Sequence, residues 1–310
     1  MPITTLAGGV GAAKFLAGLA RVAGQPRLNV IVNTGDDEEF YGLHVSPDLD
    51  TVTYTLAGVS NRATGWGLAG ETFNVLPALS RFFGKPWFNL GDRDLATHIF
   101  RTERLRAGDP LSRIAAEIAR RLGVRARLMP MTDERVRTFV KLRGRDPMPF
   151  QEYFVRRRAR GIVERIELRG VSRARPLAAA LDAVRQSSAV IIAPSNPFVS
   201  IGPILALRPM RAAIRRERPR VAAISPIIGR KAVKGPADRM LRGLGHEPSA
   251  LGVARLYRDI CATFVIDEAD RALAPAIERL GMHPVVTDII MADETRAARL
   301  AEVVLRAAGE

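Results

Sequence analysis

The stretch Ile3-Thr4-Thr5-Leu6-Ala7-Gly8-Gly9-Val10-Gly11-Ala12-Ala13-Lys14 decides the fold. Its apolar first part predicts a short buried strand over residues 1–7, and the glycine cluster that follows predicts a tight turn. Apolar residues at helical spacing then predict a helix over residues 12–22. A second run of branched apolar residues at 28–32 predicts another buried strand. A strand, a helix and a strand in this order favour a parallel sheet with right-handed crossovers.

The same alternation resumes in the second half of the chain. Further strands are predicted at 189–193, 220–224, 263–266 and 284–286, and a closing helix at 294–307. Other helices are predicted from Pro47 to about residue 57 and over 70–83, 111–122 and 176–186. We therefore expect an α/β, Rossmann-like domain over residues 1–136 and 170–310, with a mostly parallel sheet flanked by helices. The Pro- and Arg-rich segment 137–169, with short strand-like pieces, is predicted to be a smaller inserted subdomain that covers or flanks the site.

Composition excludes several classes of protein. The 310 residues are 47% hydrophobic and 25% charged, which is typical of an ordinary globular protein and not of a disordered chain. The one cysteine, Cys261, excludes an internal disulfide and a cysteine-based zinc site. No apolar run is long enough for a membrane span, and the first residues lack a signal peptide pattern. We expect a cytoplasmic protein without a membrane partner.

The formal net charge of +15 comes almost entirely from arginine. A basic surface attracts phosphate-bearing ligands or nucleic acid, but it can also be simply solvated. The arginines are scattered, apart from Arg156-Arg157-Arg158 with Arg160, and aromatic residues do not alternate with them. We therefore do not expect a nucleic acid partner. A basic nucleic-acid-binding protein remains one alternative reading of the chain.

The glycine cluster is a candidate phosphate cradle, because glycines let the backbone approach oxygens and the following helix presents free N–H groups. Gly9, Gly11 and Lys14 are the residues we assign to it. The loop departs from the dinucleotide fingerprint, since Lys14 stands where the third glycine belongs. Asn33 also stands where that fold expects an acidic residue for the ribose. An NAD(P)-dependent dehydrogenase is therefore a disfavoured alternative, and a tight turn without a ligand also stays open.

Polar residues follow the predicted strands at several distant points, and parallel strands bring such points to one edge of a sheet. Ser46-Pro47-Asp48-Leu49-Asp50-Thr51 begins a helix, and its oxygens could hold Mg²⁺. Asp48 and Asp50 are two residues apart, so they should point to different sides of that helix. Arg93 could clamp a phosphate beside Asp92. The other candidates are Asn33 and Thr34 after the second strand and Ser195, Asn196 and Ser225 after later ones. Each group could also be an ordinary turn or helix cap.

Six pieces of the sequence, in order, resemble the 2-phospho-L-lactate transferase family of coenzyme F-420 biosynthesis. They are Leu6-Ala7-Gly8-Gly9-Val10-Gly11, Val32-Asn33-Thr34-Gly35-Asp36-Asp37, Ser46-Pro47-Asp48-Leu49-Asp50-Thr51, Gly91-Asp92-Arg93-Asp94-Leu95-Ala96-Thr97, Ala193-Pro194-Ser195-Asn196-Pro197 and Ser225-Pro226-Ile227-Ile228-Gly229. The resemblance spans most of the chain.

The resemblance implies a Mg²⁺-dependent transferase with small-molecule substrates. A phosphorylated three-carbon acid, activated by GDP, would pass to the ribityl hydroxyl of the deazaflavin Fo, and GMP would leave. Asp50, Asp92 and Arg93 would be catalytic, Asp48, Asp50, Thr51 and Arg93 would bind Fo, and Asp48 and Asp50 would hold the metal. Gly9, Gly11, Lys14, Asn33, Thr34, Ser195, Asn196 and Ser225 would bind the nucleotide and its phosphates. Which acid is transferred (2-phospho-L-lactate, phosphoenolpyruvate or 3-phosphoglycerate) and whether the protein is a homodimer stay open.

Overall fold

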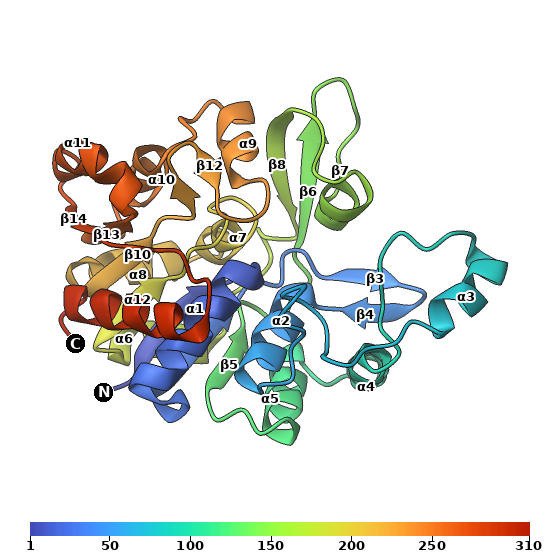
Figure 1. The fold of residues 1–310 in the computed structure, drawn as a ribbon. Helices are drawn as coiled ribbons and strands as arrows, with labels where there is room; N and C mark the ends of the chain where they lie inside the picture. The colour runs from blue at the N-terminus through green and yellow to red at the C-terminus, as the bar shows by residue number, and fades with distance from the viewer.

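The first strand, β1 (Ile3–Ala7), lies in the middle of a seven-stranded sheet in the computed structural model, which describes residues 1–310 (Figure 1). All neighbouring strands are parallel, in the order β14-β13-β10-β9-β1-β2-β5. The other strands of this sheet are β2 (Leu28–Val32), β5 (Arg127–Pro130), β9 (Ala189–Ile192), β10 (Val221–Ile224), β13 (Thr263–Ile266) and β14 (His283–Val286). The predicted α/β, Rossmann-like fold is confirmed.

Strand order reverses beside β1. The chain moves from β1 toward β2 and β5 on one side, and it returns to the other side for β9, β10, β13 and β14. In an open parallel sheet, such a switch point leaves a crevice outside the carboxyl ends of the strands. The loops after β1 and β9 therefore border the expected binding crevice.

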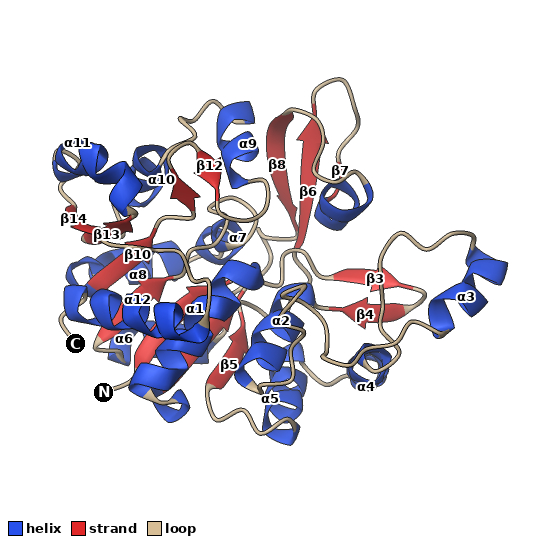
Figure 2. Ribbon diagram, viewed as in Figure 1, coloured by secondary structure: helices blue, strands red, loops and turns tan.

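Helices cover both faces of the sheet (Figure 2). The helices are α1 (Gly9–Ala23), α2 (Pro47–Leu56), α3 (Val75–Phe83), α4 (Asp94–Arg106), α5 (Leu111–Arg121), α6 (Ala178–Gln186), α7 (Ile201–Ala206), α8 (Met210–Arg216), α9 (Ala237–Gly243), α10 (Ala250–Tyr257), α11 (Ala274–Glu278) and α12 (Glu294–Ala307). None of them combines the length and the apolar character that crossing a lipid bilayer requires.

Alternate residues of each central strand enter one of two large apolar cores. Ile191 of β9 packs with α1, α2, α5 and α12, whereas Val190 and Ile192 pack with α6, α7, α8 and α10. Side chains of successive strand residues point to opposite faces, so a strand buried on both faces reads as a continuous apolar run. This is why the central strands could be predicted from the sequence.

Besides the short hairpin of β11 (Ile227–Ile228) and β12 (Lys231–Ala232), two smaller antiparallel units extend from the carboxyl end of the sheet (Figure 1). One is the hairpin of β3 (Glu38–Phe40) and β4 (Leu43–Val45). The other contains β6 (Arg137–Leu142), β7 (Met148–Pro149) and β8 (Val163–Arg169), with a π-helical turn at Glu152–Arg156 between β7 and β8. Residues 137–169 thus form a separate sheet with its own small apolar core.

One helix differs clearly from its predicted bounds. The helix predicted over 70–83 begins only at Val75. The residues before it are held in a loop by Asp92, whose carboxylate accepts hydrogen bonds from the Thr72 hydroxyl and from the backbone N–H groups of Asn74 and Val75. A long-range contact therefore replaces the helical hydrogen bonds that the local pattern predicts.

Candidate functional site

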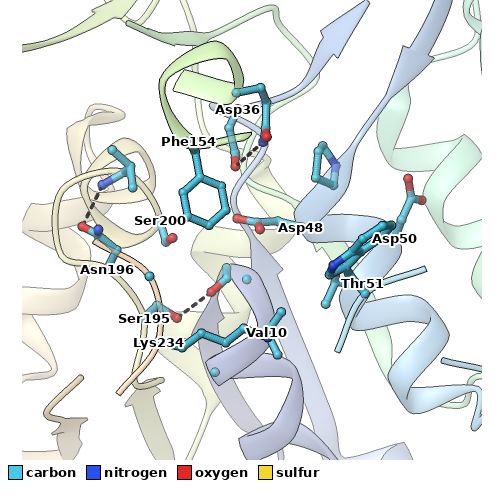
Figure 3. Close-up of a pocket in the computed structure, with 18 of the residues that line it drawn as sticks. Val10, Asp36, Asp48, Asp50, Thr51, Phe154, Ser195, Asn196, Ser200 and Lys234 are labelled. Carbon is cyan, nitrogen blue, oxygen red and sulfur yellow. Dashed lines mark hydrogen bonds between the residues drawn. The ribbon is translucent and has the colours of Figure 1, made fainter. Parts of the chain in front are cut away.

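A cavity of about 340 Å³ opens at the carboxyl ends of β1, β9 and β10 (Figure 3). Its walls come from segments far apart in the sequence: the β1–α1 loop, the start of α2, the inserted sheet and the loops after β9 and β10. The lining includes Gly8, Gly9, Gly11, Asp36, Asp48, Asp50, Thr51, Tyr54, Trp66, Phe88, Asp94, His98, Phe150, Phe154, Ser195, Asn196, Ser225 and Lys234. The cavity lies at the switch point of the sheet, where ligands bind in this class of fold.

The β1–α1 loop packs tightly against the rest of the site. A Cβ atom on Gly8 would lie 2.6 Å from an Asp48 oxygen, and one on Gly11 would lie 2.6 Å from the Pro194 carbonyl oxygen. Neither contact leaves room for a side chain. Glycine is required here because loops from the two halves of the chain meet, which the sequence alone does not reveal.

Two buried carboxylates share one amide at the centre of the site. Asn33 donates from Nδ2 to Asp36 and, at 2.9 Å, to Asp48. Its amide also donates to the Val199 carbonyl at 3.1 Å. In Figure 3, the Asp48 side chain points toward the middle of the cavity, beside the ring of Phe154. Asn33 is fully buried and outside the lining, so it positions the two carboxylates from behind.

The acid–base properties of this pair follow from burial. Burial raises the pKa of Asp48 to about 6, although the hydrogen bond from Asn33 opposes the rise. Burial also raises the pKa of Asp36 well above its ordinary value, and the negative charges of Asp48 and Asp37 raise it further. Two adjacent carboxylates without a cation beside them resist losing both protons.

Asp50 belongs to a different network. The guanidinium of Arg101 donates to both carboxylate oxygens of Asp50, one of them at 3.1 Å. The buried imidazole of His98 lies next to this pair, with Nδ1 3.3 Å from Arg101 Nη1 and Nε2 3.4 Å from Asp94 Oδ2. The Tyr54 hydroxyl in turn donates to Asp94. Asp48 and Asp50 therefore face different partners, as their two-residue spacing predicts.

This network shifts the pKa values of Asp94 and Tyr54 in opposite directions. Burial opposes ionisation of Asp94, but the hydrogen bond and positive charge of His98 outweigh it and lower the pKa of Asp94. Burial and the charges of Asp50 and Asp94 raise the pKa of the Tyr54 hydroxyl, which stays protonated as a donor. Arg101, Asp94, Tyr54 and His98 were not among the predicted site residues, although Asp94 lies within one of the quoted motifs and His98 follows it by four residues.

Two lysine side chains carry positive charge to the part of the site beside the amino end of α1. Lys234 lines the cavity, and its pKa is lowered by burial and by the nearby charge of Lys14. Lys14 lies outside the lining, and its ammonium is 3.5 Å from the Met291 carbonyl oxygen. The amino end of α1 adjoins both groups. Two close ammonium groups at the start of a helix favour an anionic ligand.

The hydroxyl and amide residues after β9 and β10 serve the local backbone as well as the cavity wall. Ser195 Oγ donates to the Gly8 carbonyl at 2.9 Å, which joins the loops after β1 and β9. Asn196 Oδ1 accepts from the Phe198 N–H at 2.9 Å, and Ser225 Oγ donates to the Ile227 carbonyl at 2.8 Å. All three side chains line the cavity.

Aromatic side chains from three separate segments complete the lining, and we refer to these rings together as the aromatic wall. Trp66, Phe88, Phe150 and Phe154 all line the cavity, and Phe154 stacks on Phe150 with ring centroids 5.4 Å apart. Phe154 is 39% exposed and Trp66 is 42% exposed, although both are large and apolar. Exposed rings in a concave site provide flat faces for a planar apolar ligand.

Four predicted site residues besides Lys14 lie outside the lining. Arg93 is exposed and donates to the Ala69 carbonyl at 2.6 Å, and Asp92 holds the loop before α3. Asn33 and Thr34 are buried behind the wall. The hydrogen bonds onto Asp92, from Val75 and Thr72 first, lower its pKa to about 2. In this structure Asp92 and Arg93 are thus built into a loop, while their neighbour Asp94 reaches the cavity.

The fold and the cavity at the switch point of its parallel sheet are typical of an α/β enzyme. A family model described as 2-phospho-L-lactate transferase CofD matches residues 3–306, and the chain belongs to this family of transferases.

Relatives of known name cover the whole chain. The phosphoenolpyruvate transferase of Streptomyces coelicolor is 41% identical over 100% of this chain and 99% of its own length. The 2-phospho-L-lactate transferase of Methanosarcina mazei is 37% identical over 97% of this chain and 98% of its own. A solved protein of the UPF0052 family from Bacillus halodurans has the same fold, with a TM-score of 0.67, 16% identity and 98% of each chain covered.

Proposed function

We propose that this transferase moves a phosphorylated three-carbon acid from its GDP-activated form to the ribityl hydroxyl of Fo and releases GMP, as a step of coenzyme F-420 biosynthesis. One observation carries the proposal: a single cavity joins an aromatic wall, buried carboxylates and the amino end of α1. These three surfaces suit a deazaflavin ring, a reacting hydroxyl and a diphosphate, respectively. 2-Phospho-L-lactate, phosphoenolpyruvate and 3-phosphoglycerate all remain candidate acids.

The reaction is one substitution at phosphorus. The hydroxyl oxygen of Fo forms a bond to the phosphorus that carries the acid, and the bond from that phosphorus to the bridging oxygen breaks. The hydroxyl proton is lost and GMP leaves with the bridging oxygen. Catalysis then depends on holding the two substrates in line and on stabilising charge on the phosphoryl oxygens.

The positive wall would bind the diphosphate. Lys234 lines the cavity, Lys14 lies close to it, and the first N–H groups of α1 are available beside them. Ser195, Asn196 and Ser225 line the neighbouring wall and would contact the nucleoside. The aromatic wall, with Phe154 and Trp66, would take the deazaflavin ring. Thr51 and the Asp50–Arg101 pair would then lie on the side of the reacting hydroxyl.

The site also fits Mg²⁺, but with a ligand pair that differs from the predicted one. Asp48 and Asp36 are adjacent and buried, and neither is neutralised by an arginine. Asp50, the other predicted ligand, is already paired with Arg101. No three His, Cys, Asp or Glu side chains form a metal site by themselves, so substrate oxygens and water would complete the shell. When bound, the ion would neutralise negative charge on the phosphates.

A binding experiment tests the aromatic wall. Replacing Phe154 by Ala removes a ring that faces the cavity, so we expect Fo to bind about tenfold more weakly, in line with ~1–1.5 kcal/mol for one ring stacking contact. Phe82→Ala is the matched control, because Phe82 is 83% exposed on α3 and does not line the cavity. Fo titrations that give equal affinities for the two variants would contradict the proposal.

The two alternatives are not favoured. The chain belongs to a transferase family, and the two named relatives described above are both transferases. For Arg93 and Asp92 we propose a supporting role, because both hold the loop that precedes α3 and α4. A homodimer is compatible with every contact described above and is not required by any of them.

A further inference from the structure

A second cavity, of about 430 Å³, lies in the inserted sheet and is almost entirely lined by arginine. It is bordered by the turn after β6 and by the end of the π-helical turn Glu152–Arg156. The lining consists of Leu142, Arg143, Arg145, Arg156, Arg157, Arg158, Arg160 and Gly161. None of these residues lines the transferase cavity.

The positive charge of this arginine pocket is poorly neutralised. Residues 141–161 carry seven basic and two acidic side chains, a net formal charge of +5. Only two carboxylates pair with these six arginines: Glu164 lies 3.4 Å from Arg143, and Glu152 lies 3.7 Å from Arg156 and 3.8 Å from Arg157. Arg145, Arg158 and Arg160 have no ion pair at all. Six guanidinium groups facing one hollow repel each other unless an anion lies between them.

A strained turn carries four of these arginines, Arg156, Arg157, Arg158 and Arg160. Arg158 and Ala159 both have φ of 51°, a left-handed conformation that costs roughly 1–2 kcal/mol for each residue with a side chain. Buried contacts hold the turn: Ala159 N–H donates to the Tyr153 carbonyl at 2.9 Å, and Arg239 donates to the Ala159 carbonyl at 2.7 Å. Tyr153 is fully buried beneath. Such strain is typical of segments that present side chains to a ligand.

We propose that the arginine pocket binds a small molecule that carries two or more phosphate groups. Guanidinium groups bind phosphate through two parallel hydrogen bonds, and several of them around one hollow suit several linked phosphates. The same turn that supplies Arg156 and Arg157 supplies Phe154 to the transferase cavity. A ligand in the arginine pocket is therefore placed to change the position of that ring. The proposal does not depend on which acid the enzyme transfers.

Direct titration with inorganic tripolyphosphate at low ionic strength tests the site. The double variant Arg158→Gln/Arg160→Gln removes two unpaired guanidinium groups from the pocket, and we expect it to bind at least about tenfold more weakly. Arg279→Gln/Arg299→Gln is the matched control, because both residues are exposed and lie outside both cavities. The control substitutions remove the same amount of positive charge as the pocket substitutions do. This control should bind as the unaltered protein does.

Three results would overturn the proposal. Equal losses in the two double variants would show that tripolyphosphate responds only to total charge. A loss confined to Lys234→Gln, with Arg158→Gln/Arg160→Gln unaffected, would place the anion in the transferase cavity. Binding of a pentaglutamate peptide as tightly as tripolyphosphate would remove the selectivity for phosphate. Arg143→Gln/Arg156→Gln gives a second pair from the pocket and should reproduce the loss if the proposal is right.

Discussion

Replacing Arg101 by Met should destabilise the protein by about 3–5 kcal/mol, because it leaves the Asp50 carboxylate buried without a partner. Arg101 is 2% exposed, and its guanidinium donates to both oxygens of Asp50. With an effective dielectric constant of about 20, charges roughly 3 Å apart attract by about 5 kcal/mol, which the unpaired carboxylate would lose. Urea unfolding at neutral pH measures the free energy of unfolding directly.

Arg104→Met is the matched control on the same helix. Its side chain is 40% exposed and pairs with Asp109 at the surface, so its loss should cost less than about 1 kcal/mol. Adding Asp50→Asn to Arg101→Met removes the stranded charge and should restore part of the stability. The reasoning fails if the two methionine variants are equally stable, or if Asp50→Asn gives no recovery.

Three further predictions concern packing, ionisation and the network around Asp94. Gly18→Ala should lower the free energy of unfolding by about 1–3 kcal/mol, since its Cβ would lie 2.3 Å from backbone atoms of α12; denaturant titration that shows no loss would contradict this packing. Without metal, Asp48 stabilises the fold below its ordinary pKa of 3.8, and this contribution is lost as pH rises through its native pKa of about 6. In EDTA, the free energy of unfolding of Asp48→Asn relative to that of the unaltered protein should therefore be higher at pH 7 than at pH 4. A difference between the two proteins that does not change with pH would refute this prediction. Burial lowers the pKa of His44 to about 4, so the contribution of His44 to stability increases as pH rises. This contribution is the same in both proteins and does not affect their difference. Tyr54→Phe removes a donor from Asp94 and should cost about 1–3 kcal/mol, whereas a thermal melt identical to that of the unaltered protein would show the bond to be dispensable.

The central sheet was predictable because its strands are buried on both faces. Mostly apolar runs such as 28–32 and 263–266 carry that signal in the residues themselves, and the structure places strands at those bounds. The edge strand β5, with Arg127 and Pro130 at its ends, has no such run and was not predicted. Likewise, the start of α3 depends on hydrogen bonds to Asp92, from a segment about twenty residues away.

Site residues could be predicted where a motif directly follows a predicted strand. They could not be predicted where a residue reaches the site only through contact with a segment far away in the sequence. Gly9, Ser195 and Ser225 follow that rule, and they line the cavity. Arg101 lies in the middle of a helix with other arginines, and nothing in its local pattern distinguishes it from Arg104. Only the packing of α4 against β4 and the pairing of Arg101 with Asp50 of α2 make one of these arginines buried and the other exposed. Phe154 came from the segment whose sequence carried the least information.

Product analysis is the most direct test of the proposed reaction. The purified protein would be incubated with Fo, Mg²⁺ and each of the three guanylylated acids separately, and the products identified by mass. We predict that at least one donor yields Fo joined through a phosphodiester to its three-carbon acid, with one GMP released for each product. If none of the three donors gives such a product, the proposed transfer to Fo is wrong.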